Sequence, residues 1–324
     1  MTTVTAQPVR VGIVGAGSLA TRVHYPSLTK SPLARIVGIC DLDRDRLDRA
    51  GEEFAVEARF TDYRTMLETV APEAVYVIGQ PEYMYGIWCW CLSHGLDLFV
   101  EKPLGLTLHQ ATNLAYLAEE NRCITQVGFQ RRASPVLMYA QSELAAYGPV
   151  THALCSFYKW QPEPMLGARD HMMDDGVHAI DTLRAVCGGE VVDIHSITRR
   201  VGTPDINFFS AQLVFDTGAV GVLVNSWTSG RRVFRVDLHV PGACAELDLE
   251  GVGHIYSDGS TAGSDVTAQS IAGSDAFYAY AGFLNKSEEF LRAVRTRHQA
   301  PSHFGDALKT MQIAEQILHR SRAI

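Results

Sequence analysis

The first 128 residues alternate short apolar runs with segments in which apolar residues recur at the spacing of a helix. The helical segments carry start signals: Asp62 precedes one of them, and Thr107-Leu-His-Gln110 forms a capping box before another. The apolar runs, each short enough for one buried strand, are residues 11–14, 35–40, 58–60, 74–78, 96–100 and 123–127. Strands and helices that alternate with short connections predict a parallel, doubly wound α/β sheet.

A different pattern begins near residue 150. From Phe234 to Val240 every second residue is apolar and the residues between them are polar, which is typical of a strand with one buried face. Further strands are predicted at residues 151–160, 191–200, 207–216, 219–227 and 243–249. Asp216-Thr-Gly218 marks a hairpin turn between two of them. Consecutive strands, interrupted by one helix near 176–187, predict a second α/β domain with a large open, mostly antiparallel sheet.

The tail returns to helical spacing over residues 283–294 and 306–320. We therefore predict a doubly wound α/β domain of the Rossmann type over residues 1–128, and a second α/β domain, whose open sheet is suited to oligomerisation, over 129–324. The last helices, within 283–324, are candidates to pack back on the Rossmann domain. An open sheet needs cover on its second face, and a partner subunit would supply it. A homodimer or homotetramer through this sheet is the expected assembly.

The composition is that of a soluble globular protein, with 47% hydrophobic and 20% charged residues and a net charge of −8. This charge argues against binding to nucleic acid, which relies on clustered Lys and Arg. No apolar run approaches the roughly 18 residues that cross a bilayer, and residues 1–8 lack the order of a signal peptide. The seven cysteines are odd in number and widely spread, which favours free thiols in the cytoplasm.

A glycine turn follows the first apolar run, in the sequence Gly15-Ala16-Gly17-Ser18-Leu19-Ala20. Gly15 would permit the tight turn, Gly17 would let the backbone approach a pyrophosphate, and the small Ala20 would let the next helix pack on the sheet. Free N–H groups and the positive end of that helix would hold the anion. The order strand, glycine turn, helix predicts a dinucleotide site.

Asp41 ends the second apolar run, 21 residues beyond Ala20. A carboxylate there would accept hydrogen bonds from the adenosine ribose and repel a 2′-phosphate, so NAD is favoured over NADP. Two other readings stay open. Asp41 is also a candidate N-cap for the helix that follows, and Arg44 or Arg46 would meet a phosphate if either side chain turned inward.

Lys102 follows the apolar run that ends at Val100, in the sequence Glu101-Lys102-Pro103. In an open α/β sheet, ligands bind beyond the carboxyl ends of the strands. A lysine at that position would hydrogen-bond a substrate hydroxyl and stabilise the alkoxide that forms as a hydride leaves. The alternative is a solvated lysine before a rigid turn.

A second candidate site lies in the segment around His178. On a helix, Asp174, His178 and Asp181 fall on one face, because they are four and three residues apart. A histidine beside carboxylates is suited to act as a general base. The alternative is a helix whose first turn carries acids, as many helices do. A metal site of His171, Asp174 and His178 matches no standard ligand spacing, so no metal is expected.

Two further features are candidates to touch a substrate. Arg131 and Arg132 lie where the two predicted domains meet, and paired arginines there would hold a phosphate or a polyol. Structural ion pairs are the other reading. Trp160, at the end of a predicted strand, is a candidate to line the pocket by its position alone.

With these motifs in order, the chain resembles the glucose–fructose oxidoreductase/inositol dehydrogenase/rhizopine catabolism (Gfo/Idh/MocA) family of NAD(P)-dependent oxidoreductases along nearly its whole length. The motifs are Gly15-Ala-Gly-x-x-Ala20, Asp41, Gly79-Gln-Pro81, Glu101-Lys-Pro103, Gly128-Phe-Gln-Arg-Arg132, Asp174-x-Gly-x-His178-x-x-Asp181 and the segment Gly305–Glu315. The resemblance implies a Rossmann domain followed by an α/β domain with a large open sheet, often used to form dimers or tetramers. It also implies reversible oxidation of a secondary alcohol on a sugar, nucleotide sugar or cyclitol.

By match of motif, Lys102 takes the place of the catalytic lysine, His178 that of the acid/base, and Asp174 that of the carboxylate that binds substrate and assists the histidine. The residues expected at the cofactor, by motif or by resemblance, are Gly15, Gly17, Ser18, Leu19, Asp41, Gln80, Pro81 and Glu101. The chain departs from the family at Gln80, where relatives usually have proline or threonine, and at Met84, where they usually have histidine. That loop lies near the nicotinamide in the family, so the shape of the pocket there is open.

Two other functions are compatible with this resemblance. One is an enzyme that holds NAD tightly and oxidises its substrate only transiently, for elimination or epimerisation. The other is a dinucleotide sensor without catalysis. In such members of the family the lysine and histidine are generally lost, whereas Lys102, Asp174 and His178 are all present here.

Overall fold

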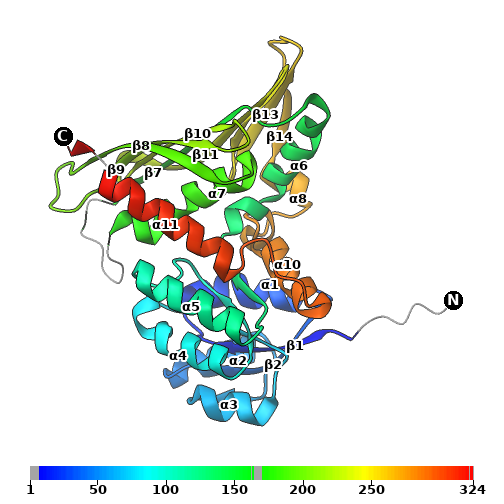
Figure 1. Cartoon of the computed structure of the whole chain (residues 1–324). Coiled ribbons are helices and arrows are strands. Elements are labelled where there is room, and N and C mark those ends of the chain that lie inside the picture. The colour runs from blue at the N-terminus through cyan, green and yellow to red at the C-terminus, as the bar shows by residue number, and fades with distance from the viewer. Residues whose placement is uncertain (1–6, 162, 164–169, 321, 324) are drawn as a thin grey trace. The chain divides into compact units, whose positions relative to one another are not determined.

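The computed structural model describes residues 7–161, 163, 170–320, 322 and 323, and the chain divides into two compact units (Figure 1). The first unit comprises the chain up to Gly105 together with His109–Gly128 and Phe283–Asp306. The second comprises Leu106–Leu108, Phe129–Gly282 and the chain from Ala307. Among the described residues, no helix combines the length and the apolar character that spanning a membrane requires.

The first unit is built on a six-stranded parallel sheet with the strand order β3-β2-β1-β4-β5-β6. Its strands are β1 (Val9–Val14), β2 (Ala34–Cys40), β3 (Arg59–Phe60), β4 (Ala74–Val77), β5 (Asp97–Val100) and β6 (Thr125–Val127). The order reverses between β1 and β4, and this reversal opens a crevice at the carboxyl ends of the strands. The predicted doubly wound parallel sheet is confirmed.

The helices of this unit are a π-helical turn η1 (Ala20–His24), α1 (Tyr25–Lys30), α2 (Arg44–Glu53), α3 (Tyr63–Val70), α4 (Pro81–Ser93), α5 (Leu108–Glu120) and α10 (Phe283–Thr296). Asp62 caps α3 by accepting from the Thr65 N–H, as predicted. The cap of α2 is Asp43, which accepts from the Arg46 N–H. The alternative in which Asp41 caps this helix is therefore wrong.

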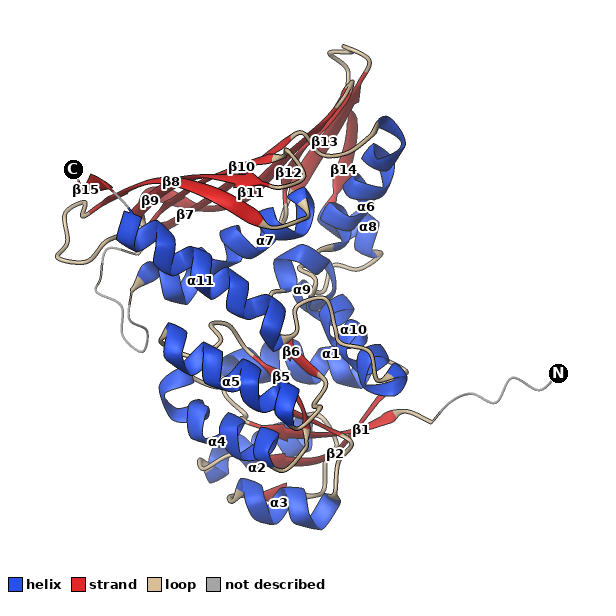
Figure 2. Cartoon of the chain, viewed as in Figure 1, coloured by secondary structure: helices blue, strands red, loops and turns tan. Residues whose placement is uncertain are grey.

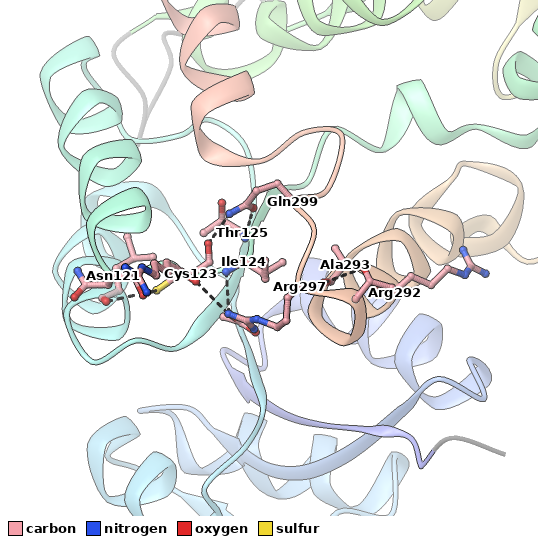
Figure 3. Close-up of polar contacts among 12 residues, drawn as sticks. Asn121, Cys123, Ile124, Thr125, Arg292, Ala293, Arg297 and Gln299 are labelled. Atoms are coloured by element: carbon pink, nitrogen blue, oxygen red, sulfur yellow. Dashed lines mark hydrogen bonds and ion pairs between the residues drawn. The ribbon is translucent and has the colours of Figure 1, made fainter. Parts of the chain in front are cut away.

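A segment from the end of the chain covers the edge strand β6. The Thr125 N–H donates to Gln299 Oε1 at 3.1 Å (Figure 3), and the Val127 N–H donates to the Ser302 carbonyl at 2.9 Å. An uncovered edge strand would present a row of unpaired backbone groups to other chains. The residues after α10 therefore complete the Rossmann sheet, although they lie about half the chain away in sequence.

Asp97 and Arg297 anchor this returning segment, and they allow a test. The Asp97 carboxylate is 4% exposed, accepts from the Ile124 N–H at 2.8 Å and forms an ion pair with Arg297. Burial raises the pKa of Asp97 above its ordinary value. Arg297→Ala leaves this buried charge with one partner fewer, so we expect unfolding free energy to fall by about 1–3 kcal/mol.

Thermal unfolding measures this loss. The loss of unfolding free energy caused by Arg297→Ala should be smaller at acid pH, because Asp97 is then protonated and carries no charge for Arg297 to compensate. An unchanged Tm at neutral pH would contradict the assigned role of the pair.

The second unit is built on a nine-stranded sheet with the order β14-β13-β12-β11-β7-β10-β9-β8-β15. Its strands are β7 (His152–Trp160), β8 (Val191–Arg199), β9 (Phe208–Phe215), β10 (Val220–Ser226), β11 (Thr228–Val240), β12 (Ala243–Asp248), β13 (Val252–Ser257), β14 (Ser264–Thr267) and β15 (Arg322–Ala323). Among these described strands, only β7 with β10 and β8 with β15 pair in parallel. The predicted mostly antiparallel sheet is confirmed, as is the hairpin that joins β9 to β10.

The helical elements of this unit are η2 (Gln130–Ala133), α6 (Pro135–Leu144), η3 (Ala145–Tyr147), η4 (Met172–Gly176), α7 (Val177–Cys187), α8 (Ala268–Ala272), α9 (Phe277–Tyr280) and α11 (Phe304–Arg320). The helices α6, α7 and α11 lie on one side of the sheet (Figure 2), where the inward residues of its strands, such as Phe209 and Leu213, are buried. None of the described helices of this unit lies on the other side, and Leu154 and Ile197 are 38% and 40% exposed.

Candidate functional site

The glycine turn admits only glycine at Gly15, and its backbone is unobstructed at Gly17. Gly15 has φ +110°, and a Cβ there would lie 2.0 Å from the Ile78 carbonyl oxygen, so only glycine fits. A Cβ added at Gly17 would meet no atom within 4 Å, so space is open above its backbone. Ser18 and Leu19 follow at the surface, and Ala20 is buried under the first helical turn. The turn is therefore a cradle that an anion can approach.

The Asp41 carboxylate lies directly beside this turn. One of its oxygens accepts from the Ala16 N–H at 2.7 Å, and the other accepts from the Asp43 N–H at 2.8 Å. These two bonds fix the carboxylate at the end of β2. Each carboxylate oxygen has a second lone pair, so both can still accept a hydroxyl group.

A cavity of about 300 Å³ lies between α2, β3 and the start of α3. It is lined by Arg44, Leu47, Asp48, Arg59, Phe60, Thr61, Asp62 and Thr65. Of the two arginines considered above, Arg44 lines this cavity, whereas Arg46 pairs with Asp43 at 3.1 Å. Of these two arginines, Arg44 is therefore the one that borders the cavity.

The loop after β4 carries Gln80, Pro81 and Met84. Gln80 is the exposed N-cap residue of α4 and makes no side-chain cap, and Pro81 is the first residue of the helix. The Met84 side chain packs against Gly79, where an added Cβ would lie 2.8 Å from the Met84 methyl group. Met84 therefore fills space beside the backbone of this loop.

Lys102 and Glu101 follow β5. Lys102 is partly exposed, whereas Glu101 is 5% exposed and its Oε1 atom lies 2.9 Å from His24 Nε2. In the parallel sheet, β2, β1, β4 and β5 are neighbours and end at the same edge. The structure therefore brings the predicted residues of the first unit together at this edge: the glycine turn, Asp41, Gln80, Pro81, Glu101 and Lys102.

In the second unit, Asp174 and His178 lie on consecutive turns of η4 and α7. His178 is 5% exposed and its ring meets that of Phe129 edge-on, with centroids 6.0 Å apart. Asp174 is partly exposed. The third residue of this predicted face, Asp181, is 1% exposed and forms an ion pair with Arg132. The ion pair of Asp181 with Arg132 therefore joins α7 to η2. This agrees with the alternative in which Arg132 forms a structural ion pair.

Sequence reasoning missed an ion pair beside Asp174. Asp175 is 7% exposed and pairs with Lys159 of β7, whose ammonium lies 5.1 Å from the centre of the Phe157 ring. A signal for this was present, because Lys159 has the same parity along β7 as the buried Cys155 and Phe157. A lysine on the inward face of a strand requires a buried carboxylate nearby.

His171 also lies in this region, but in a different environment. It is 1% exposed, and its ring stacks on that of Trp227 with centroids 4.9 Å apart. Burial lowers the pKa of His171, which keeps the ring neutral at neutral pH. In the part of the chain that the structure describes, no three His, Cys, Asp or Glu side chains form a group suited to a metal ion.

The structure gives the Arg131 guanidinium an internal carboxylate partner. Arg131 is 3% exposed, pairs with Glu250 and lies 4.6 Å from the centre of the Phe234 ring. Glu250 also pairs with Arg232 at 3.1 Å. Trp160, by contrast, is 66% exposed at the end of β7. Of these two candidates for substrate contact, the exposed one is Trp160.

The Glu250 cluster predicts a dependence of stability on pH. Burial acts to raise the pKa of Glu250, but the two arginines outweigh it and hold this pKa at about 2, below the ordinary 4.5. Glu250 therefore stabilises the fold above about pH 4.5, and this contribution is lost as the pH falls toward 2. Glu250→Gln should lower the unfolding free energy at pH 7 by about 1–3 kcal/mol and flatten its decline in acid.

Thermal unfolding at several pH values measures both effects. Glu246→Gln is the matched control, since Glu246 is 41% exposed and pairs with an exposed arginine. Equal effects of the two substitutions would contradict a special role for Glu250.

Two protein-family models match the chain. Residues 9–129 match the family described as "Oxidoreductase family, NAD-binding Rossmann fold", and residues 142–243 match the "GFO/IDH/MocA C-terminal domain". The scyllo-inositol 2-dehydrogenase (NAD(+)) of Bacillus subtilis (strain 168) is 26% identical over 233 residues, which are 68% of this chain and 68% of that protein. The rhizopine catabolism protein MocA of Rhizobium meliloti is 26% identical over 197 residues, 59% of this chain and 61% of that protein.

Solved structures share the fold over nearly the whole chain. A dehydrogenase from Chromobacterium violaceum has a TM-score of 0.88 at 21% identity, covering 98% of this chain and 96% of that one. An oxidoreductase from Agrobacterium radiobacter, in complex with NAD+, L-tartaric acid and magnesium, has a TM-score of 0.83 at 18% identity, covering 97% and 96%. The chain belongs to the GFO/IDH/MocA family of oxidoreductases, and its residues 9–129 are an NAD-binding Rossmann domain.

Proposed function

We propose that this protein moves a hydride between NAD and a secondary alcohol carbon of a sugar, nucleotide sugar or cyclitol. The observation that carries the proposal is the edge of the first sheet, where Lys102 follows β5 at the same carboxyl edge as the glycine turn and Asp41. Related proteins named for such substrates support it: besides the inositol dehydrogenase, the UDP-N-acetylglucosamine 3-dehydrogenase of Acidithiobacillus ferrooxidans is 22% identical over 253 residues.

Each residue of the proposed machinery has a separate task. The Lys102 ammonium donates a hydrogen bond to the substrate oxygen and stabilises the negative charge that develops there. His178 accepts the hydroxyl proton as the carbonyl forms and returns it in the reverse direction. Asp174 holds a neighbouring substrate hydroxyl and assists His178. Bound NAD supplies the hydride acceptor, held at the glycine turn, at Asp41 and at the loop of Gln80 and Pro81.

The test is a panel of sugars, nucleotide sugars and inositols, each with NAD and with NADP, followed by the absorbance of the reduced cofactor. We expect oxidation of at least one polyol or sugar alcohol. A panel without any turnover, in protein that binds NAD, would contradict the dehydrogenase proposal.

Cofactor choice is a second testable part of the proposal. Asp41 favours NAD, because its carboxylate would lie close to a 2′-phosphate and repel it. Asp41→Ser keeps a hydrogen-bonding group and removes the charge, so the preference for NAD over NADP should fall by about tenfold, equivalent to 1.4 kcal/mol. The ratio of kcat/KM values for the two cofactors measures this.

Arg44 provides the control for this prediction. If its guanidinium meets the 2′-phosphate from the cavity beside α2, then adding Arg44→Ala to the Asp41→Ser variant should reduce the use of NADP again. An unchanged preference in the Asp41→Ser variant would place the discrimination elsewhere.

We also propose that copies of the chain associate as a homodimer or homotetramer through the helix-free side of the nine-stranded sheet, in the cytoplasm. The exposed apolar side chains of Leu154 and Ile197 on that sheet support the proposal. Light scattering on the purified protein gives the mass of the assembly directly.

A further inference from the structure

Strand β5 has a buried carboxylate immediately at each end. Asp97, its first residue, is 4% exposed and pairs with Arg297. Glu101, the residue after its last, is 5% exposed and meets His24. Buried carboxylates are costly unless a partner compensates them. The two pairs are therefore comparable in kind, but only the second lies at the carboxyl edge of the sheet.

The His24–Glu101 contact is enclosed by aromatic rings. The His24 ring meets Tyr76, Phe99 and Phe283 edge-on, with centroids 5.9, 5.3 and 5.9 Å apart. Since a carboxylate can only accept hydrogen bonds, His24 Nε2 donates the hydrogen bond to Glu101. The other ring nitrogen has no hydrogen-bond partner among the described residues. Glu101 is therefore the polar group that fixes this ring, in surroundings that strengthen the bond.

A third segment holds the same carboxylate. A Cβ at Gly128 would lie 2.4 Å from Glu101 Oε1 and 3.0 Å from Oε2, so the carboxylate sits against the backbone that follows β6. The Gly128 N–H also donates to the Val100 carbonyl at 2.8 Å. The main chain that leads into Lys102 is thus tied to β6 by its backbone and to His24 by the Glu101 side chain.

The sequence positions of the pair give it a functional meaning. His24 ends η1, the helical turn that directly follows the glycine turn. Glu101 directly precedes Lys102. The contact therefore joins the helix expected to hold the pyrophosphate to the residue expected to hold the substrate oxygen. Asp97 and Arg297 join two segments that carry neither role.

We propose that His24 and Glu101 are positioning residues, which fix the place of Lys102 relative to the helix that follows the glycine turn. In this proposal Glu101 acts through the backbone that it holds, rather than by touching the cofactor with its carboxylate. The inference rests on the proposed role of Lys102. A displacement of a reacting group by about 1 Å can cost on the order of 100-fold in rate, so loss of the contact should be visible in kcat.

His24→Phe tests the proposal, because it keeps the aromatic packing and removes the donor. We expect kcat for the alcohol identified in the substrate panel to fall by about 10- to 100-fold, with the Kd for NAD changed by less than about threefold. His24→Gln, whose amide can donate to Glu101, should recover most of the rate. Acylation of Lys102 by acetic anhydride, followed by mass spectrometry, should become several-fold faster in His24→Phe.

Arg297→Ala is the matched control at the other end of β5. It should lower Tm without changing kcat or the labelling of Lys102, as expected of a purely structural pair. If His24→Phe keeps wild-type kcat and labelling, the positioning proposal is wrong. If no substrate is turned over, or Lys102→Ala keeps full activity, the proposed function fails instead, and the labelling rate still decides whether His24 positions Lys102.

Discussion

Lys102→Ala is expected to lower kcat by about 100-fold or more, while NAD still binds. The reason is electrostatic: the ammonium stabilises charge that develops on the substrate oxygen only as the hydride leaves, so its loss raises the barrier more than it weakens ground-state binding. Steady-state kinetics on the alcohol found in the substrate panel, together with a binding titration for NAD, measure the two quantities separately.

Two variants sharpen this test. Lys102→Arg keeps the positive charge but not the compact ammonium, so it should restore only part of the activity. Lys30→Ala removes an exposed lysine from α1 in the same unit and should leave kcat unchanged. A rate near wild type in Lys102→Ala would remove this lysine from the mechanism, although the glycine turn and Asp41 would remain as a cofactor site.

His178→Ala is the other substitution with a large expected effect, again a loss of about 100-fold or more in kcat, because general acid–base catalysis commonly contributes 10²- to 10⁴-fold. The pH profile adds a specific signature. A protonated imidazole cannot accept the hydroxyl proton, so the wild-type rate of oxidation should fall on the acid side. In His178→Ala, this acid limb should disappear.

His319→Ala is the matched control for the histidine, because this ring is 81% exposed on α11 and pairs with Glu315. It should change neither the rate nor the pH profile. An acid limb that survives unchanged in His178→Ala would assign the proton transfer to another group.

Local patterns were sufficient to locate most of the fold. The alternation in residues 234–240 predicts which side chains face inward, and Phe234, Val236, Leu238 and Val240 are indeed 7% exposed or less. The Asp62 cap and the Asp216-Thr-Gly218 hairpin also lie where they are predicted. These features succeed because each depends on residues that are close together in the chain.

The elements that were not predicted depend on distant partners or on weak signals. Strands β13 and β14 lie in a stretch rich in Gly and Ser, and their formation depends on pairing of β13 with β12 and of β14 with β13, which supplies the backbone hydrogen bonds. No helix is predicted over residues 135–144, yet α6 forms there, with Pro135 in its first turn and an apolar side against the rest of the unit. The returning residues 299–302 carry no strand pattern, although they complete the edge of β6.

The sequence by itself determined the order of most strands and helices, the glycine turn and the residue types at the ends of the strands, because these follow from backbone conformation and from the period of the apolar residues. Only the tertiary structure decided which charge meets which: Glu101 with His24, Asp181 with Arg132, and Asp175 with Lys159. Such pairs join residues 16 to 77 positions apart. A side chain's partner depends on how the elements pack, and no local pattern encodes that.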